Sequence, residues 1–314
     1  MKNIDFIKEI KKLKKEKNII LLAHFYQTPD IQNIADFVGD SLALAQKASA
    51  AEASIILIAG VKFMAETAKL LVPEKKVLIP DINAGCSLAD SCKPEEFRNF
   101  IEENPGRTIV SYVNTSVEIK AMSDIICTSS NAIKIIESLP EDEKIIFAPD
   151  RNLGNYIKSK TARDILVWDG ACHVHEKFSV ERIIELKKKY RNAKIIVHPE
   201  CELPVRMIAD FIGSTSALLN FTKNDDSDIY IVATEPGILH QMIKANSNKK
   251  YIPAPPSDPF CACSECNYMK MITIEKIYYT MLNEEPEILI NNDLLKRASR
   301  PVLKMFELSS RFGL

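Results

Sequence analysis

Short apolar runs alternate with longer amphipathic stretches along the whole chain. The runs are rich in Ile and Val, and stretches with helical spacing of apolar residues separate them. We predict strands at residues 19–23, 55–59, 77–79, 108–113, 145–148, 165–168, 194–197, 228–233 and 251–253. Continuous apolar strands separated by helices are typical of parallel sheets that are covered on both faces. The pattern therefore predicts an α/β fold built from βαβ units.

Three features recur in a fixed order, once in each of three copies. The first is a polar residue that ends a strand, the second is a hydroxyl residue 17 positions later, and the third is a cysteine 60 to 68 positions after the strand end. The three sets are His24, Ser41 and Cys86; Tyr112, Ser129 and Cys172; and His198, Thr215 and Cys266. Because all three features keep their register, the pattern predicts an internal triplication.

The repeat also predicts the domain organisation. Residues 1–106, 107–192 and 193–270 are expected to form three similar αβα three-layer domains with short parallel sheets, the first carrying an N-terminal helix at 3–17. Residues 271–314 are expected to form helices that pack back on the body. Ligands bind beyond the carboxyl ends of parallel strands. Copies around a pseudo-threefold axis would therefore create an active site at their common centre.

The cysteines offer the clearest candidate chemistry. Three converging thiolates suit an iron–sulfur cluster or zinc. Structural zinc usually takes cysteines in close local pairs, which Cys86 and Cys172 lack, so the spacing favours a [4Fe-4S] cluster with three cysteine ligands and one open iron. Zinc and inert buried cysteines remain open alternatives. From spacing alone, the third ligand is Cys261, Cys263 or Cys266.

The three hydroxyl residues have two interpretations. Ser and Thr are favoured helix N-caps, but a helix start also attracts anions through its free N–H groups and its dipole. Three copies in register favour carboxylate or phosphate binding. Among the histidines, His24 and His198 occupy equivalent strand ends. Further candidates for moving protons are Tyr26, Tyr112, His175 and, if burial raises its pKa, Glu200.

The net charge and the lengths of the apolar runs narrow the range of possible functions. The net charge is -1, from 41 basic and 42 acidic residues, which argues against a nucleic-acid partner. The apolar run at 19–23 is too short for a secretory signal, and no run approaches a membrane span. We therefore expect a cytoplasmic protein with reduced cysteines and no membrane partner.

Several motifs together resemble those of the quinolinate synthase family, which builds the pyridine ring of NAD. They are Ala23–Gln27, Gly39–Leu42, Ala84–Ala89, Tyr112–Asn114, Cys172–His175, His198–Cys201, Gly213–Ser216, Ala233–Glu235 and Cys266–Lys270, and they span nearly the whole chain. The resemblance implies three αβα domains about a pseudo-threefold axis. It also implies a central [4Fe-4S] cluster on Cys86, Cys172 and Cys266, the last because it precedes a Met-Lys pair.

The resemblance further implies a condensing and dehydrating transferase. The family joins iminoaspartate to dihydroxyacetone phosphate, giving quinolinate, phosphate and water, and is linked functionally to L-aspartate oxidase or aspartate dehydrogenase. The implied substrate contacts are His24, Ser41, Tyr112, Val113, Asn114, Ser129, His198, Pro199, Glu200 and Thr215. The residues assigned to catalysis are Tyr26, His175, His198 and Glu200.

Two other functions remain open. The first is another [4Fe-4S] dehydratase or lyase, which would use the open iron in the same way. The second is a non-enzymatic iron–sulfur redox sensor, which would not explain the repeated hydroxyl residues. Some family members have Cys-x-x-Cys-x-x-Cys where this chain has Cys-x-Cys-x-x-Cys, so a redox role of Cys263 stays open.

Overall fold

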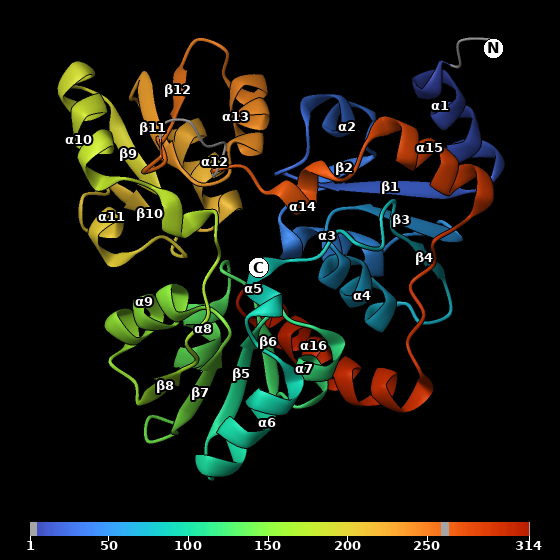
Figure 1. Cartoon of the computed structure of the whole chain (residues 1–314), viewed down its shortest axis with the longest axis horizontal. Helices are drawn as coiled ribbons and strands as arrows, with labels where there is room; N and C mark the ends of the chain where they lie inside the picture. Colours follow the sequence, from blue (N-terminus) through green and yellow to red (C-terminus); the bar gives the residue numbers. More distant parts are fainter. Residues whose placement is uncertain (1–4, 259–263, 314) are drawn as a thin grey trace.

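The computed structural model describes residues 5–258 and 264–313. In this part of the chain the strands form three parallel sheets of four strands each, and all three share one strand order. The first strand of each repeat lies between the second and the third. The sheets belong to three lobes that surround a common centre (Figure 1). The prediction of an α/β fold with three similar domains is confirmed.

The strands follow the predicted order. The first sheet contains β1 (Ile19–His24), β2 (Phe37–Gly39), β3 (Ile55–Ala59) and β4 (Lys76–Leu78). The second contains β5 (Thr108–Tyr112), β6 (Ile125–Cys127), β7 (Ile145–Ala148) and β8 (Ile165–Val167). The third contains β9 (Lys194–Val197), β10 (Phe211–Ile212), β11 (Ile229–Ala233) and β12 (Lys250–Pro253). All nine predicted strands are present, each within one residue of its predicted bounds.

The prediction missed the second strand of every repeat: β2, β6 and β10. These strands have only two or three residues, too few to form an apolar run, and each lies at the edge of its sheet. An aspartate directly before each strand ties it to the central strand. The carboxylates of Asp36, Asp124 and Asp210 accept the backbone N–H groups of Leu21, Ile109 and Ile195, each at 2.8 Å. This clamp is a further feature that repeats three times.

Helices connect the strands, both within one sheet and between one sheet and the next. The first repeat has α1 (Phe6–Glu16), α2 (Pro29–Ile34), α3 (Ser41–Ser49), α4 (Lys62–Leu71), α5 (Ser87–Asp90) and α6 (Pro94–Glu103). The second has α7 (Val117–Ala121), α8 (Ala132–Glu137), α9 (Arg151–Thr161), the 3₁₀ turn η1 (His175–Lys177) and α10 (Val180–Lys189). The third has α11 (Leu203–Met207), α12 (Thr215–Asn224), the 3₁₀ turn η2 (Pro236–Ile238), α13 (Leu239–Ala245) and α14 (Asn267–Lys270).

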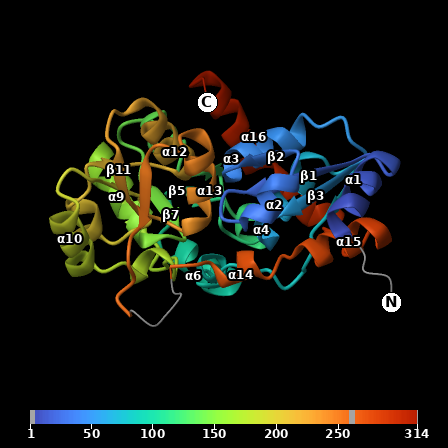
Figure 2. The same ribbon diagram turned by 90° about the horizontal axis from the view of Figure 1, so that it is seen from above.

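Two further helices pack back on the lobes. Helix α15 (Ile274–Asn283) lies against α1 (Figure 2). Helix α16 (Asn292–Arg311) contacts α4, α7 and β6, so it touches both the first and the second repeat (Figure 1). Its buried face includes Ala298, Val302 and Met305, at helical spacing. These side chains belong to one continuous apolar core that extends from the first sheet into the second.

The third sheet is built around separate apolar clusters. The domain boundaries at residues 106, 192 and 270 remain a prediction. Within the described ranges, no helix is both long and apolar enough to span a bilayer.

Candidate active site

A cavity lies where the three repeats meet, and each repeat contributes to its wall. The wall contains most of the predicted site residues: His24, Tyr26, Ser41, Cys86, Tyr112, Asn114, Ser129, Cys172, His175, His198, Glu200, Thr215 and Cys266. The exceptions are Val113 and Pro199, which are buried but do not line the cavity. The fold thus brings together residues that lie far apart in the sequence, and their functional roles remain predictions.

Cys86, Cys172 and Cys266 supply one free thiol from each repeat. Burial raises the pKa of Cys86 to about 12, raises that of Cys172 well above the ordinary value, and also raises that of Cys266. The thiols act on one another as well, because Cys266 adds to the rise at Cys86, and both add to the rise at Cys172. Thiols in this setting ionise readily only beside a cation, so the donor set fits a thiolate-bound metal group.

The other cysteines are placed differently. Cys92, Cys127 and Cys201 are buried within the apolar clusters of the lobes and do not line the cavity. Cys261 and Cys263, the other candidates for the third ligand, lie outside the described residues.

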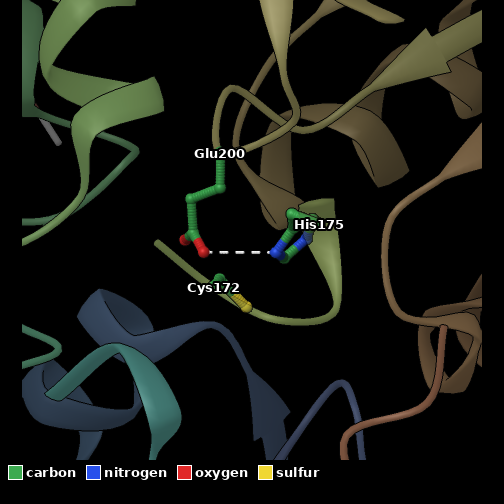
Figure 3. A group of neighbouring side chains, drawn as sticks. All are labelled: Cys172, His175 and Glu200. Carbon is green, nitrogen blue, oxygen red and sulfur yellow. Dashed lines mark ion pairs between the residues drawn. The ribbon is translucent and has the colours of Figure 1, made fainter. Parts of the chain in front are cut away.

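Cys172 also belongs to a second set of donor atoms. Its sulfur, a ring nitrogen of His175 and a carboxylate oxygen of Glu200 all lie within 4.8 Å of one another (Figure 3). Sulfur, imidazole and carboxylate are ligands that zinc and iron accept. The cavity therefore offers a metal three kinds of donor in one place, with Cys172 common to both sets.

Glu200 is the centre of a polar network. The Tyr112 hydroxyl donates a hydrogen bond to Glu200 Oε1 at 2.6 Å, and His175 Nδ1 lies 3.2 Å from Oε2 (Figure 3). Burial pushes the pKa of Glu200 up, but His175 beside its carboxylate and the hydrogen bond from the Tyr112 hydroxyl outweigh burial and hold this pKa below its ordinary value. The interpretation of Glu200 as a carboxyl with a raised pKa is therefore wrong. Glu200 is an ionised acceptor.

His24 and His198 share one local arrangement at equivalent strand ends. In each, ring Nδ1 accepts the backbone N–H of the residue two positions later, from Tyr26 at 3.2 Å and from Glu200 at 3.3 Å. Because Nδ1 is an acceptor, the ring proton of the neutral form lies on Nε2. Burial lowers the pKa of His24 to about 4 and that of His198 to about 3. Both rings are therefore neutral at pH 7 and can donate from Nε2.

Tyr26 contacts two threonines. Its hydroxyl lies 2.7 Å from Thr234 Oγ1 and 3.2 Å from Thr215 Oγ1. Thr234 Oγ1 is also 3.0 Å from His175 Nε2. Burial, followed by the charge of Glu200, raises the pKa of Tyr26 well above its ordinary value, so the phenol keeps its proton at neutral pH.

The three repeated hydroxyl residues are not N-caps. Ser41 and Thr215 are the first residues of α3 and α12, and the preceding Asp40 and Ser214 cap these helices by accepting the N–H groups of residues 43 and 217. Ser129 precedes α8, whose N-cap is Asn131. The simple capping interpretation is therefore wrong, and all three hydroxyl residues line the cavity. Near the starts of α3 and α12, the helix dipoles favour an anion.

Sequence reasoning assigned no role to Glu235 or Lys270. Glu235 is fully buried in the cavity wall, and its Oε1 lies 2.8 Å from Lys270 Nζ and 3.4 Å from the backbone nitrogen of Cys266. Lys270 also donates to the carbonyl oxygen of Tyr26 at 2.8 Å. The ion pair fastens α14 to the end of β11 within the third repeat, and the contact with Tyr26 joins α14 to the first repeat. Glu235 could have been found from the sequence, because it lies just after the apolar run of β11, and other cavity residues also lie just after apolar runs.

The chain is similar in sequence to known proteins of one family. The model of the family described as "Quinolinate synthetase A protein" matches residues 8–307. The chain is 55% identical to a quinolinate synthase of Rippkaea orientalis over 305 residues, covering 97% of this chain and 94% of the relative. It is 53% identical to that of Thermosynechococcus vestitus over 306 residues, with coverages of 98% and 96%. It is 51% identical to that of Chloroherpeton thalassium over 309 residues, again with coverages of 98% and 96%.

The match extends through all three sheets and includes every cavity residue predicted from the repeat. The chain therefore belongs to the quinolinate synthetase A protein family.

Proposed function

We propose that this chain condenses iminoaspartate with dihydroxyacetone phosphate to form quinolinate, phosphate and water, as a step of NAD synthesis. The observation that carries the proposal is the convergence of thiols and hydroxyl groups from three repeats on one cavity. Membership of the family supports it. Both substrates are anions, which suit the hydroxyl-bearing helix starts.

Cys86, Cys172 and Cys266 would hold a [4Fe-4S] cluster, whose remaining iron supplies a Lewis acid that polarises oxygen or nitrogen atoms of the substrate. The fit rests on the donor set, since these three thiols share one cavity and each is neutral without a nearby cation.

The hydroxyl residues bind the anionic groups. Ser41 and Thr215 line the cavity at the first residues of α3 and α12, where free N–H groups and the helix dipoles add to each hydroxyl. Ser129 contributes the corresponding hydroxyl from the second repeat. Asn114 Oδ1 is buried without a hydrogen-bond partner in the described part of the protein, so it can accept an N–H or O–H of a substrate.

Two side chains transfer protons, and two histidines assist them. The Tyr26 phenol keeps its proton at neutral pH and gives it from its hydroxyl to a departing substrate oxygen. Glu200, which is ionised, accepts a proton at its carboxylate during condensation and ring closure. His198 is neutral and donates a hydrogen bond from Nε2, while His175 lies against the Glu200 carboxylate and orients it.

The proposed substrates also indicate the surrounding metabolism. Iminoaspartate is the oxidation product of aspartate, so L-aspartate oxidase or aspartate dehydrogenase is the expected source. The reduced thiols that the reaction needs persist in the cytoplasm, which is the proposed location.

The test combines cofactor content with product formation. Anaerobically purified protein should be brown, contain about four irons per chain and produce quinolinate in a coupled assay. Cys86→Ala should lose both colour and activity. Cys92→Ala, which removes a buried thiol outside the cavity, should keep both.

Three results would contradict the proposal. A colourless but active Cys86→Ala protein would exclude the cluster. A brown protein that dehydrates another substrate and makes no quinolinate would support a different [4Fe-4S] lyase. A brown protein without turnover that binds a regulatory partner would support a redox sensor.

A further inference from the structure

Thr234 joins two cavity residues without lining the cavity itself. It follows β11 directly, in the third repeat, and its side chain is almost fully buried. Its hydroxyl oxygen lies 2.7 Å from the Tyr26 hydroxyl and 3.0 Å from His175 Nε2. Tyr26 belongs to the first repeat and His175 to the second. One hydroxyl thus connects side chains from all three repeats.

We propose that Thr234 is a positioning residue, whose shared hydroxyl holds the Tyr26 phenol and the His175 imidazole in the orientation that the reaction needs. This inference rests on the proposed function for the meaning of that orientation. A threonine hydroxyl has one hydrogen to donate and two lone pairs that accept. It can therefore donate to one of its two neighbours while it accepts from the other.

Tyr26 and His175 differ in how far their hydrogen bonding depends on the Thr234 hydroxyl. Without it, Tyr26 would keep a longer contact with Thr215, at 3.2 Å. His175 Nε2 would lose the one hydrogen-bond partner that it has among the residues the structure describes. A buried ring nitrogen left unpaired is costly. Removing the hydroxyl should therefore let the phenol turn toward Thr215 and free the imidazole to rotate.

The effect of that rotation would reach Glu200. On its other side the His175 ring lies 3.2 Å from Glu200 Oε2 (Figure 3). The Tyr112 hydroxyl donates to Glu200 Oε1 at 2.6 Å. The polar contacts thus run without a break from Tyr26 through Thr234, His175 and Glu200 to Tyr112. Thr234 is the only member of this series that does not line the cavity. Its loss should therefore change turnover more than substrate binding.

The experiment separates the hydroxyl from the shape of the side chain. Thr234→Val keeps the branched shape and removes the hydroxyl, whereas Thr234→Ser keeps the hydroxyl and removes the methyl group. In the cluster-loaded enzyme, Thr234→Val should lower kcat on the order of 10- to 100-fold, the cost of a misplaced reacting group. KM should stay within about twofold, because uniform binding is unaffected. Thr234→Ser should restore kcat to within about threefold of the unmodified enzyme.

The opposite effects of the two variants on kcat would overturn the proposal. If Thr234→Val keeps kcat and Thr234→Ser loses it, Thr234 acts by packing. If Thr234→Val raises KM and leaves kcat unchanged, Thr234 contributes to substrate binding instead.

A second measurement does not depend on the reaction. Melting temperatures of the holoproteins with Tyr26→Phe, Thr234→Val and both changes form a double-mutant cycle. Because the two hydroxyl groups are partners, the double variant should lose less than the sum of the two single shifts. A wild-type protein that makes no quinolinate but shows this coupling would refute the proposed function and retain the positioning contact. Additive shifts would refute the positioning contact, whatever the activity.

Discussion

Replacing Lys270 by methionine tests how the third repeat is fastened to the first. The variant removes the partner of Glu235, whose side chain is fully buried, and the donor to the Tyr26 carbonyl. Glu235 would retain the Gly237 N–H at 2.7 Å and the more distant Cys266 N–H at 3.4 Å. Breaking a buried pair typically costs 3–5 kcal/mol. Since the Lys270 side chain is 24% exposed, we expect about 3 kcal/mol, at the lower end of that range.

The assay is urea unfolding of the anaerobic protein, followed by circular dichroism. A matched control is Lys304→Met, which breaks an exposed ion pair with Glu307 on α16 and should cost less than about 1 kcal/mol. Burial already raises the pKa of Glu235, and losing Lys270 should raise that pKa further. The destabilisation should therefore be largest above this pKa and shrink as the pH falls and the carboxyl group is protonated.

The double variant decides the interpretation. Adding Glu235→Gln to Lys270→Met removes the unpaired charge, so it should recover most of the lost stability. If Lys270→Met costs no more than Lys304→Met, the buried pair with Glu235 and the contact with Tyr26 stabilise the fold no more than an exposed ion pair does. If the double variant is as unstable as the single one, the cost comes from the Tyr26 contact and not from the charge.

Two further predictions concern the ionised and neutral groups of the cavity. Glu200→Gln should lower kcat of the cluster-loaded enzyme by roughly 100-fold or more, because it removes the ionised acceptor. Tyr112→Phe should lower kcat by a smaller factor. Unchanged quinolinate formation in Glu200→Gln would contradict the role assigned to Glu200. The pKa of His24 is lowered from 6.5 to about 4 in the folded protein, so the unfolded chain binds a proton first as the pH falls below 6.5. Between pH 7 and pH 5 His24 should therefore lower the free energy of unfolding by about 2 kcal/mol. In urea unfolding, the stability of the His24→Gln variant should depend less on pH than that of the unmodified protein. Equal dependence on pH in the two proteins would refute the lowered pKa of His24.

Strand pattern and spacing were sufficient to predict the long strands, the three copies and most of the cavity wall. The runs at β1, β5 and β9 are apolar because helices cover them, and their ends carry the polar residues that the repeat selected. The edge strands β2, β6 and β10 could not be found this way. Their position depends on an aspartate clamp from outside the strand, which a search for apolar runs does not detect.

Two kinds of site information were beyond sequence reasoning. The capping interpretation of Ser41 and Thr215 failed because the preceding residue caps each helix, a shift of one position that composition cannot resolve. Thr234 was missed because its role depends on two contacts between different repeats. The state of Glu200 likewise depends on groups from the second repeat, which outweigh the burial that the residue type alone suggests.

Helix α16 sets the order in which the protein can be completed during synthesis. It closes the core shared by the first two repeats, yet it is made after all three sheets. Contacts between α16 and α4 join residues more than two hundred positions apart, a separation that slows folding. A nascent chain that already carries every cavity residue would therefore still lack the helix that secures two of its three lobes. Assembly of the central cavity should therefore wait until α16 has been synthesised.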